Sequence, residues 1–310
     1  MAEIHDLRVA HMLLVHKNPD QVNALVRQLL AEGHADVYIH VDAKCTEEVI
    51  RAIASGSSVT VLDDRVSVTW GDYNTIDATL LLLKAVRAAG KSYDFVTLNS
   101  GQDLLVRDGL TAFLAANQGK IFLEAERFEE NDPRNFYWRI RWPVVTRNVY
   151  DSALHPYRLL RAALRSFYFW GINLRPNPHA LPDRWLFHRG SQWFCITGEA
   201  AGYILDFLAQ NPAYELAFKD SLVPDMSFFQ TLLMNSPLAA QVTGANLTYL
   251  NFGTTYGDSN HPVVLTMNDV PAIESSRRFF ARKFEPTVDA DVIRYFCEKV
   301  GVRGSQPALV

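Results

Sequence analysis

Residues 8–42 read RVAHMLLVHKNPDQVNALVRQLLAEGHADVYIHVD, and this stretch decides the fold class. An apolar run centred on residues 12–15 is followed by apolar residues at helical spacing up to Gly33, and then by a second apolar run at 37–41. Asn18 stands just before the helical spacing and is of a type preferred as a helix N-cap. The stretch therefore predicts a strand, a helix and a second strand.

The same alternation continues along the first part of the chain. Short apolar runs and helical spacing follow one another at residues 47–54, 59–62, 74–90, 95–98 and 108–116. Strands that alternate with helices are typical of a mostly parallel sheet covered on both faces, and such sheets bind ligands beyond the carboxyl ends of their strands. His16, Asp42 and residues 99–103 follow predicted strands, so we expect an α/β fold with its site at that edge.

The periodicity fades between residues 128 and 189, where aromatic and arginine residues are frequent. Pro176, Pro178 and Pro182 interrupt any long helix there. We expect an aromatic-rich insertion that contains one helix, at about residues 156–170.

Arginines at helical spacing mark one face of this expected helix: Arg158, Arg161 and Arg165. Such a face could bring the protein to a membrane surface as a peripheral contact. A helix face that is simply solvated is the plainer alternative.

The composition excludes several classes of protein. The chain has 310 residues, of which 48% are hydrophobic and 21% charged, as expected for a soluble globular protein with a sizeable core. The net charge of −4 provides no basic field for nucleic acid. Cys45, Cys195 and Cys297 show neither metal-type spacing nor a disulfide framework. With no signal peptide and no integral membrane segment evident, we expect a cytoplasmic location.

Short blocks spread over most of the chain carry a family resemblance. They are LVHK to YIHVD (14–42), VTWG (68–71), LNSGQD (98–103), FLEAE (122–126), GSQWF (190–194), PD (224–225), FFQT (228–231) and FARKF (280–284). Each block is weak alone, but together and in this order they resemble the core-2/I-branching glycosyltransferase family. That family includes branching β-1,6-N-acetylglucosaminyltransferases and peptide O-xylosyltransferases.

The resemblance implies a single GT-A-like nucleotide-sugar domain over residues 1–310. Within it we expect a nucleotide-binding half at 8–127, an acceptor side with a diphosphate segment at 128–285, and a C-terminal helix and tail at 286–310. The implied reaction is the inverting, metal-independent transfer of N-acetylglucosamine or xylose from a UDP-sugar to a hydroxyl of a glycan or glycolipid. No cofactor is implied, and the expected setting is bacterial polysaccharide or glycolipid synthesis.

Without a metal, cationic side chains must absorb the charge of the leaving diphosphate. The match to the family's phosphate-contacting segment assigns this role to Arg282 and Lys283, and the upstream Arg277 and Arg278 are possible helpers. The alternative is a solvated basic turn. The literal Asp-x-Asp at residues 289–291 lies near the C-terminal helix, and we interpret it as a capping pair rather than a metal site.

Three further residues are candidates for the nucleotide and diphosphate. Asp42 follows a strand and could accept hydrogen bonds from base or ribose, or it could only cap the next turn. His16 lies at a strand end, where a structural role is the alternative. Asp103 could orient the donor or its own loop through an Asx-type turn, and Gly101 would permit a tight turn and a close approach of ligand.

Three residues are candidates for binding the acceptor. Glu124 resembles the family's acceptor-binding glutamate, which accepts hydrogen bonds from sugar hydroxyls. Glu126 is its near neighbour, and repulsion between the two would raise one pKa and create a possible base, unless both are solvated. Trp193 could stack on a sugar ring or pack in the core.

Met226 occupies the position at which the family carries its catalytic base, a glutamate. A thioether does not accept a proton at neutral pH, so the base has to lie elsewhere, for example at Asp225, Glu124 or Glu126. Alternatively, the residue has been altered, or the chain is a non-catalytic UDP-sugar-binding or regulatory protein. If residues 224–231 form one helix, Met226 shares a face with Phe229 and is expected in the core.

Overall fold

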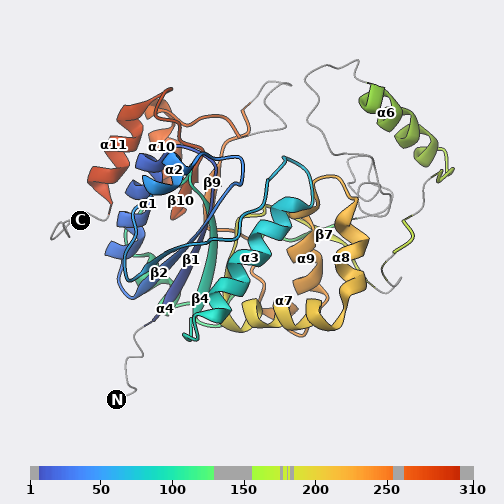
Figure 1. The fold of residues 1–310 in the computed structure, drawn as a ribbon, viewed down its shortest axis with the longest axis horizontal. Coiled ribbons are helices and arrows are strands. Elements are labelled where there is room, and N and C mark those ends of the chain that lie inside the picture. The colour runs from blue at the N-terminus through green and yellow to red at the C-terminus, as the bar shows by residue number, and fades with distance from the viewer. Residues whose placement is uncertain are drawn as a thin grey trace.

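The computed structural model describes residues 7–128, 156–174, 177–179, 181, 185–253 and 262–300. Its central sheet has the strand order β3-β2-β1-β4-β8 (Figure 1). The bounds are β1 Val9–Val15, β2 Ala35–Val41, β3 Val59–Val61, β4 Phe95–Ser100 and β8 Cys195–Thr197. All neighbours pair in parallel except β4 and β8, which are antiparallel. The predicted α/β class with a mostly parallel sheet is therefore confirmed.

Helices cover both faces of this sheet, as Figure 1 shows. One face is covered by α1 (Pro19–Ala31), α10 (Val270–Ser276) and α11 (Ala290–Lys299), and the other by α3 (Asn74–Ala88), α7 (Gly198–Gln210) and α9 (Phe228–Met234). The buried side chains of β1 alternate between the two cores: Ala10 and Met12 join one, while Leu13 and Val15 join the other. This period of two follows from the pleat of a strand and explains why β1 reads as a continuous apolar run.

The smaller elements include strands that pair early parts of the chain with late parts. They are α2 (Glu47–Arg51), α4 (Leu110–Ala115), α8 (Pro212–Lys219), β5 (Leu104–Leu105), β6 (Glu126–Arg127), β7 (His188–Arg189), β9 (Thr248–Leu250), β10 (Phe280–Arg282) and the 3-10 turns η1 (Pro224–Met226), η2 (Ala239–Gln241) and η4 (Met267–Asp269). A second sheet has the order β5-β10-β9, and β6 pairs with β7. β5 pairs with β10 and β8 pairs with β4, so strands from before and after residue 127 share both sheets.

The predicted helix in the insertion is present as α6 (Pro156–Phe169), which Figure 1 shows standing apart from the sheet. Leu164 packs against Leu222 of the main body, and Arg165 is exposed. The side chain of Arg158 and residues 129–155 of the insertion lie outside the described residues. Within the described part, no helix combines the length and apolar character required to cross a bilayer.

Candidate functional site

A cleft of about 1140 Å³ opens beyond the carboxyl ends of β1, β2 and β4, where the parallel-sheet rule predicts it. The predicted site residues that line it come from both halves of the sequence: His16, Asp42, Glu124, Glu126, Trp193, Asp225, Met226, Arg282 and Lys283. Asp103 does not line it, and neither do the suggested helpers Arg277 and Arg278. The fold thus assembles one site from segments more than 260 residues apart.

Asp103 lies behind the cleft wall and is completely buried. Its Oδ2 accepts a hydrogen bond from the backbone N–H of Ser100 (2.9 Å), and its Oδ1 lies 3.3 Å from Nε of Arg282, in an ion pair without hydrogen-bond alignment. Burial raises the pKa of Asp103 to about 6, and the charge of Arg282 opposes this rise. Direct contact with a donor is incompatible with this burial, so Asp103 orients its loop and supports Arg282.

Arg282 ends β10 and is held between two groups. Its Cζ lies 3.8 Å from the centre of the Trp193 ring, and Asp103 supplies the opposite charge. Burial lowers the pKa of Arg282, and Asp103 counteracts this. Trp193 is 8% exposed and packs in a hydrophobic core, while it also lines the cleft and its ring contacts the guanidinium of Arg282.

Lys283 lines the cleft and, among the described residues, has no carboxylate within 4 Å. Lys17 pairs with Glu285, Lys44 lies 3.6 Å from Asp42, and Arg282 pairs with Asp103. Burial lowers the pKa of Lys283, and the positive charges of Arg282 and Lys17 lower it further.

The two upstream arginines do not line the cleft, which corrects the expectation that they could help to bind diphosphate. Arg278 donates a hydrogen bond to the carbonyl oxygen of Asn246. Arg277 ends α10 with a left-handed backbone (φ 56°), and its carbonyl accepts a hydrogen bond from Arg107 (2.8 Å).

Asp42 lines the cleft and also caps the turn that follows β2. Its Oδ1 accepts a hydrogen bond from the backbone N–H of Lys44 (2.8 Å), and its Oδ2 accepts one from Val68 (3.3 Å). His16 is exposed at the cleft, and desolvation, followed by the charge of Lys17, lowers its pKa. His40 is structural, since its Nε2 accepts a hydrogen bond from the backbone N–H of Val66 (2.9 Å).

Within the described ranges, no group of three or more His, Cys, Asp or Glu side chains lies in an arrangement that could hold a metal ion. The Asp289–Asp291 pair belongs to a helix cap, as predicted: Oδ1 of Asp289 accepts hydrogen bonds from the backbone N–H groups of Asp291 and Val292 at the start of α11.

Glu124 and Glu126 face different partners. Oε2 of Glu124 accepts hydrogen bonds from Nδ2 of Asn246 (3.1 Å) and from the backbone N–H of Ser191 (3.4 Å). Oε2 of Glu126 accepts two from Arg189 (2.9 and 2.7 Å), in an exposed ion pair. The two carboxylates thus have separate partners, and the charge of Glu126 is paired with that of Arg189.

Gly190 links the two walls of this part of the cleft. Its backbone N–H donates to the carbonyl of Met226 (2.9 Å), and a Cβ atom at this position would lie 1.8 Å from the carbonyl oxygen of Glu124. Any other residue would force these segments apart, so the glycine is required by close backbone approach.

The segment at residues 224–231 is not one helix, which corrects the expectation for Met226. It divides into η1 and α9 at Ser227 (φ −138°), so Met226 lies in a 3-10 turn and lines the cleft rather than the core. Val223, just before η1, has a left-handed backbone (φ 55°). Such a conformation is strained for a β-branched residue, and strain of this kind gathers at functional sites.

Asp225 is the described cleft carboxylate whose negative charge is least balanced by hydrogen bonds and ion pairs. Its Oδ1 is enclosed and has no hydrogen-bond partner among the residues that the structure describes, while the residue as a whole still reaches the cleft. Burial raises its pKa from 3.8 to about 6, and a hydrogen bond from its own backbone opposes this. A carboxylate in this state is ionised at neutral pH and is a better proton acceptor than an exposed aspartate.

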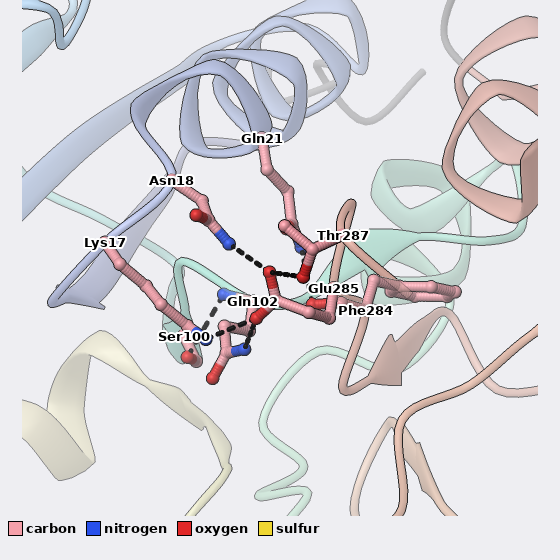
Figure 2. Close-up of polar contacts among 8 residues, drawn as sticks. All are labelled: Lys17, Asn18, Gln21, Ser100, Gln102, Phe284, Glu285 and Thr287. Atoms are coloured by element: carbon pink, nitrogen blue, oxygen red, sulfur yellow. Dashed lines mark hydrogen bonds and ion pairs between the residues drawn. The ribbon is translucent and has the colours of Figure 1, made fainter. Parts of the chain in front are cut away.

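Three cleft residues that were not predicted as site residues are Lys17, Asn18 and Gln102. They converge on the buried carboxylate of Glu285, as Figure 2 shows. The available signal was position alone, because Lys17 and Gln102 lie inside two of the motif blocks and Glu285 directly follows a third.

Comparisons with known proteins agree with this geometry. The sequence profile of the family described as Core-2/I-Branching enzyme matches residues 9–274. Xylosyltransferase 2 of Mus musculus is 27% identical over 93% of this chain and 33% of its own length, and a xylosyltransferase of Ciona intestinalis is 23% identical over 94% and 34%. This chain therefore spans about a third of these relatives. They are animal proteins and give no support to the predicted bacterial setting.

A solved structure of the bifunctional glycosyltransferase WbbM, in its apo form, is also similar. The alignment has a TM-score of 0.45 and 12% sequence identity, and it covers 97% of this chain and 51% of that one.

Proposed function

The chain belongs to the Core-2/I-branching enzyme family, and on this premise we propose that it is an inverting glycosyltransferase that uses a UDP-sugar. The donor sugar is N-acetylglucosamine or xylose, and the acceptor is a hydroxyl of a glycan or glycolipid. The observation that carries the proposal is a single cleft in which two cationic residues, Arg282 and Lys283, lie with an uncompensated carboxylate, Asp225.

Arg282 and Lys283 neutralise the diphosphate as it leaves. Lys283 has no carboxylate within ion-pair distance among the described residues, so its charge is available to a ligand. Arg282 is held rigidly between Trp193 and Asp103, so it requires little reorganisation when charge develops. These fixed cations support a transfer that needs no metal.

Asp225 accepts the proton of the attacking hydroxyl. Met226 cannot do this, and among the carboxylates considered for the role Glu126 is paired with Arg189 and Glu124 accepts two hydrogen bonds. Within the described part of the chain, Oδ1 of Asp225 has no hydrogen-bond partner, and the raised pKa of about 6 suits a base that works near neutral pH.

Glu124 orients the acceptor. The hydrogen bonds described for it both involve Oε2, so Oε1 is available to a sugar hydroxyl. Asp42 and His16 line the part of the cleft beyond β1 and β2, and they bind the nucleoside.

The second candidate is a UDP-sugar-binding protein without turnover, and Met226 at the family's base position is the observation that favours it. Incubation with UDP-N-acetylglucosamine or UDP-xylose separates the two, with UDP release as the readout. Release by the wild type that falls at least a hundredfold in Asp225→Asn supports the enzyme. Binding of either donor without release, in the presence and absence of glycan acceptors, supports the binder.

A further inference from the structure

Glu285 follows the FARKF segment and lies just behind the cleft wall. It is 9% exposed and does not itself line the cleft. Its Oε1 accepts hydrogen bonds from Nδ2 of Asn18 (2.9 Å) and the hydroxyl of Thr287 (3.3 Å), and its Oε2 accepts from Nζ of Lys17 and from Nε2 of Gln102 (3.3 Å) (Figure 2). Three of these four donors, Lys17, Asn18 and Gln102, do line the cleft.

This carboxylate joins three segments that are remote in sequence. Lys17 and Asn18 come from the loop between β1 and α1, Gln102 follows β4, and Glu285 follows β10. The backbone reinforces the junction, because the N–H of Phe284 donates to the carbonyl of Gln102 (2.9 Å). The hydrogen bond from Lys17 is the largest cause that lowers the pKa of Glu285, so the carboxylate is ionised at neutral pH.

The charge of Glu285 also explains how cations can gather on this wall. Lys17, Arg282 and Lys283 lie close enough that the first two lower the pKa of Lys283, whereas Glu285 raises it. The side chain of Lys17 is 42% exposed, so its ammonium is held by Glu285 and still accessible from the cleft. Without a buried anion, three neighbouring cations would repel one another.

We infer that Glu285 is a positioning residue that sets Lys17 beside Lys283, so that the two lysines bind one diphosphate together. The inference rests on the proposed function, because it specifies how the same cleft holds its donor. Glu285 acts through Lys17, Asn18 and Gln102 and does not touch the substrate.

The test is a UDP titration at fixed ionic strength, together with KM and kcat for the UDP-sugar. The variants are Glu285→Gln, Lys17→Met and the double variant. Glu274→Gln is the matched control, because Glu274 also accepts hydrogen bonds from a lysine, Lys299, but lies away from the cleft. Each single variant is expected to weaken UDP binding and to raise KM for the UDP-sugar about tenfold, since one charge-assisted contact is lost.

The double variant is expected to have about the same affinity for UDP as the single variant with the lower affinity, because both changes remove the same contact. Multiplied losses in the double variant, or unchanged UDP affinity in a folded Glu285→Gln, would overturn the inference. If Glu285→Gln fails to fold, Lys17→Met decides, because it changes an accessible side chain. If Lys283→Ala loses UDP affinity and Lys17→Met does not, the inference about Glu285 is refuted while the proposed function stands. If the wild type does not bind UDP, the proposed function itself is refuted.

Discussion

Asp225→Asn is expected to stabilise the protein while it abolishes transfer. The substitution keeps the shape of the side chain and removes its charge. Burial raises the pKa of Asp225 from 3.8 to about 6, so the fold disfavours the ionised form by about two pKa units. This corresponds to up to ~3 kcal/mol at neutral pH.

The sign follows from the direction of the shift. A raised pKa means that the folded state binds the proton more tightly than the unfolded state, so this contribution to stability is complete below pH 3.8 and is lost as the pH rises through about 6. At pH 7.5 the ionised Asp225 lowers the free energy of unfolding, and asparagine removes that cost. At pH 4 the aspartate is protonated, and the two proteins should differ little.

Thermal unfolding at pH 7.5 and pH 4, with a pH–rate profile of UDP release, is the assay. We expect the melting temperature of Asp225→Asn to rise by a few degrees at pH 7.5 only. Turnover falls about 10²–10⁴-fold, and the wild-type rate declines about tenfold per pH unit below pH 6. Asp206→Asn is the control, since Asp206 is exposed and pairs with Arg87 away from the cleft. A destabilised Asp225→Asn that retains turnover would refute the assignment of the base.

Three further predictions concern other parts of the site and its surroundings. Met226→Glu restores the family's base, so UDP release by Asp225→Asn should recover at least tenfold when this change is added; no recovery would show that the cleft cannot place a base there. Glu124→Gln should raise KM for the acceptor about tenfold and leave KM for the donor unchanged, because a hydrogen bond to a charged group is lost; equal effects on both would contradict the acceptor role. Phe167 and Trp170 at the end of α6 are exposed. If this helix makes the peripheral membrane contact, replacing both residues with serine should reduce co-sedimentation of the protein with anionic vesicles. A wild-type protein that does not sediment with the vesicles would exclude this contact.

The first half of the fold could be predicted because its signal is local. β1, α1, β2 and β4 have apolar runs or helical spacing, and the parallel-sheet rule then places His16 and Asp42 at one edge. The rest of the architecture depends on strands of three residues, such as β8 and β10, which are too short to show a period. Each of these two strands pairs with a strand about a hundred or more residues away, β8 with β4 and β10 with β5.

The candidate site was predictable as a set of residues but not as a set of contacts. The motif blocks identified Arg282 and Lys283, yet the burial of Asp103 and the ring of Trp193 under Arg282 follow from packing alone. The pairing of Lys17 with Glu285 spans 268 positions and has no local signal. Residues 224–231 were mispredicted as one helix because apolar spacing does not register the break at Ser227 (φ −138°), which separates η1 from α9.

The most direct test of the account compares the affinities of UDP and uridine for the wild type and for Lys283→Ala by calorimetry, in the presence of a chelator. If fixed cations hold the diphosphate, UDP should bind at least a hundredfold more tightly than uridine, and Lys283→Ala should reduce that difference about tenfold while uridine affinity stays unchanged. Equal affinities of UDP and uridine for the wild type, or a preference for UDP that is undiminished in Lys283→Ala, would contradict it.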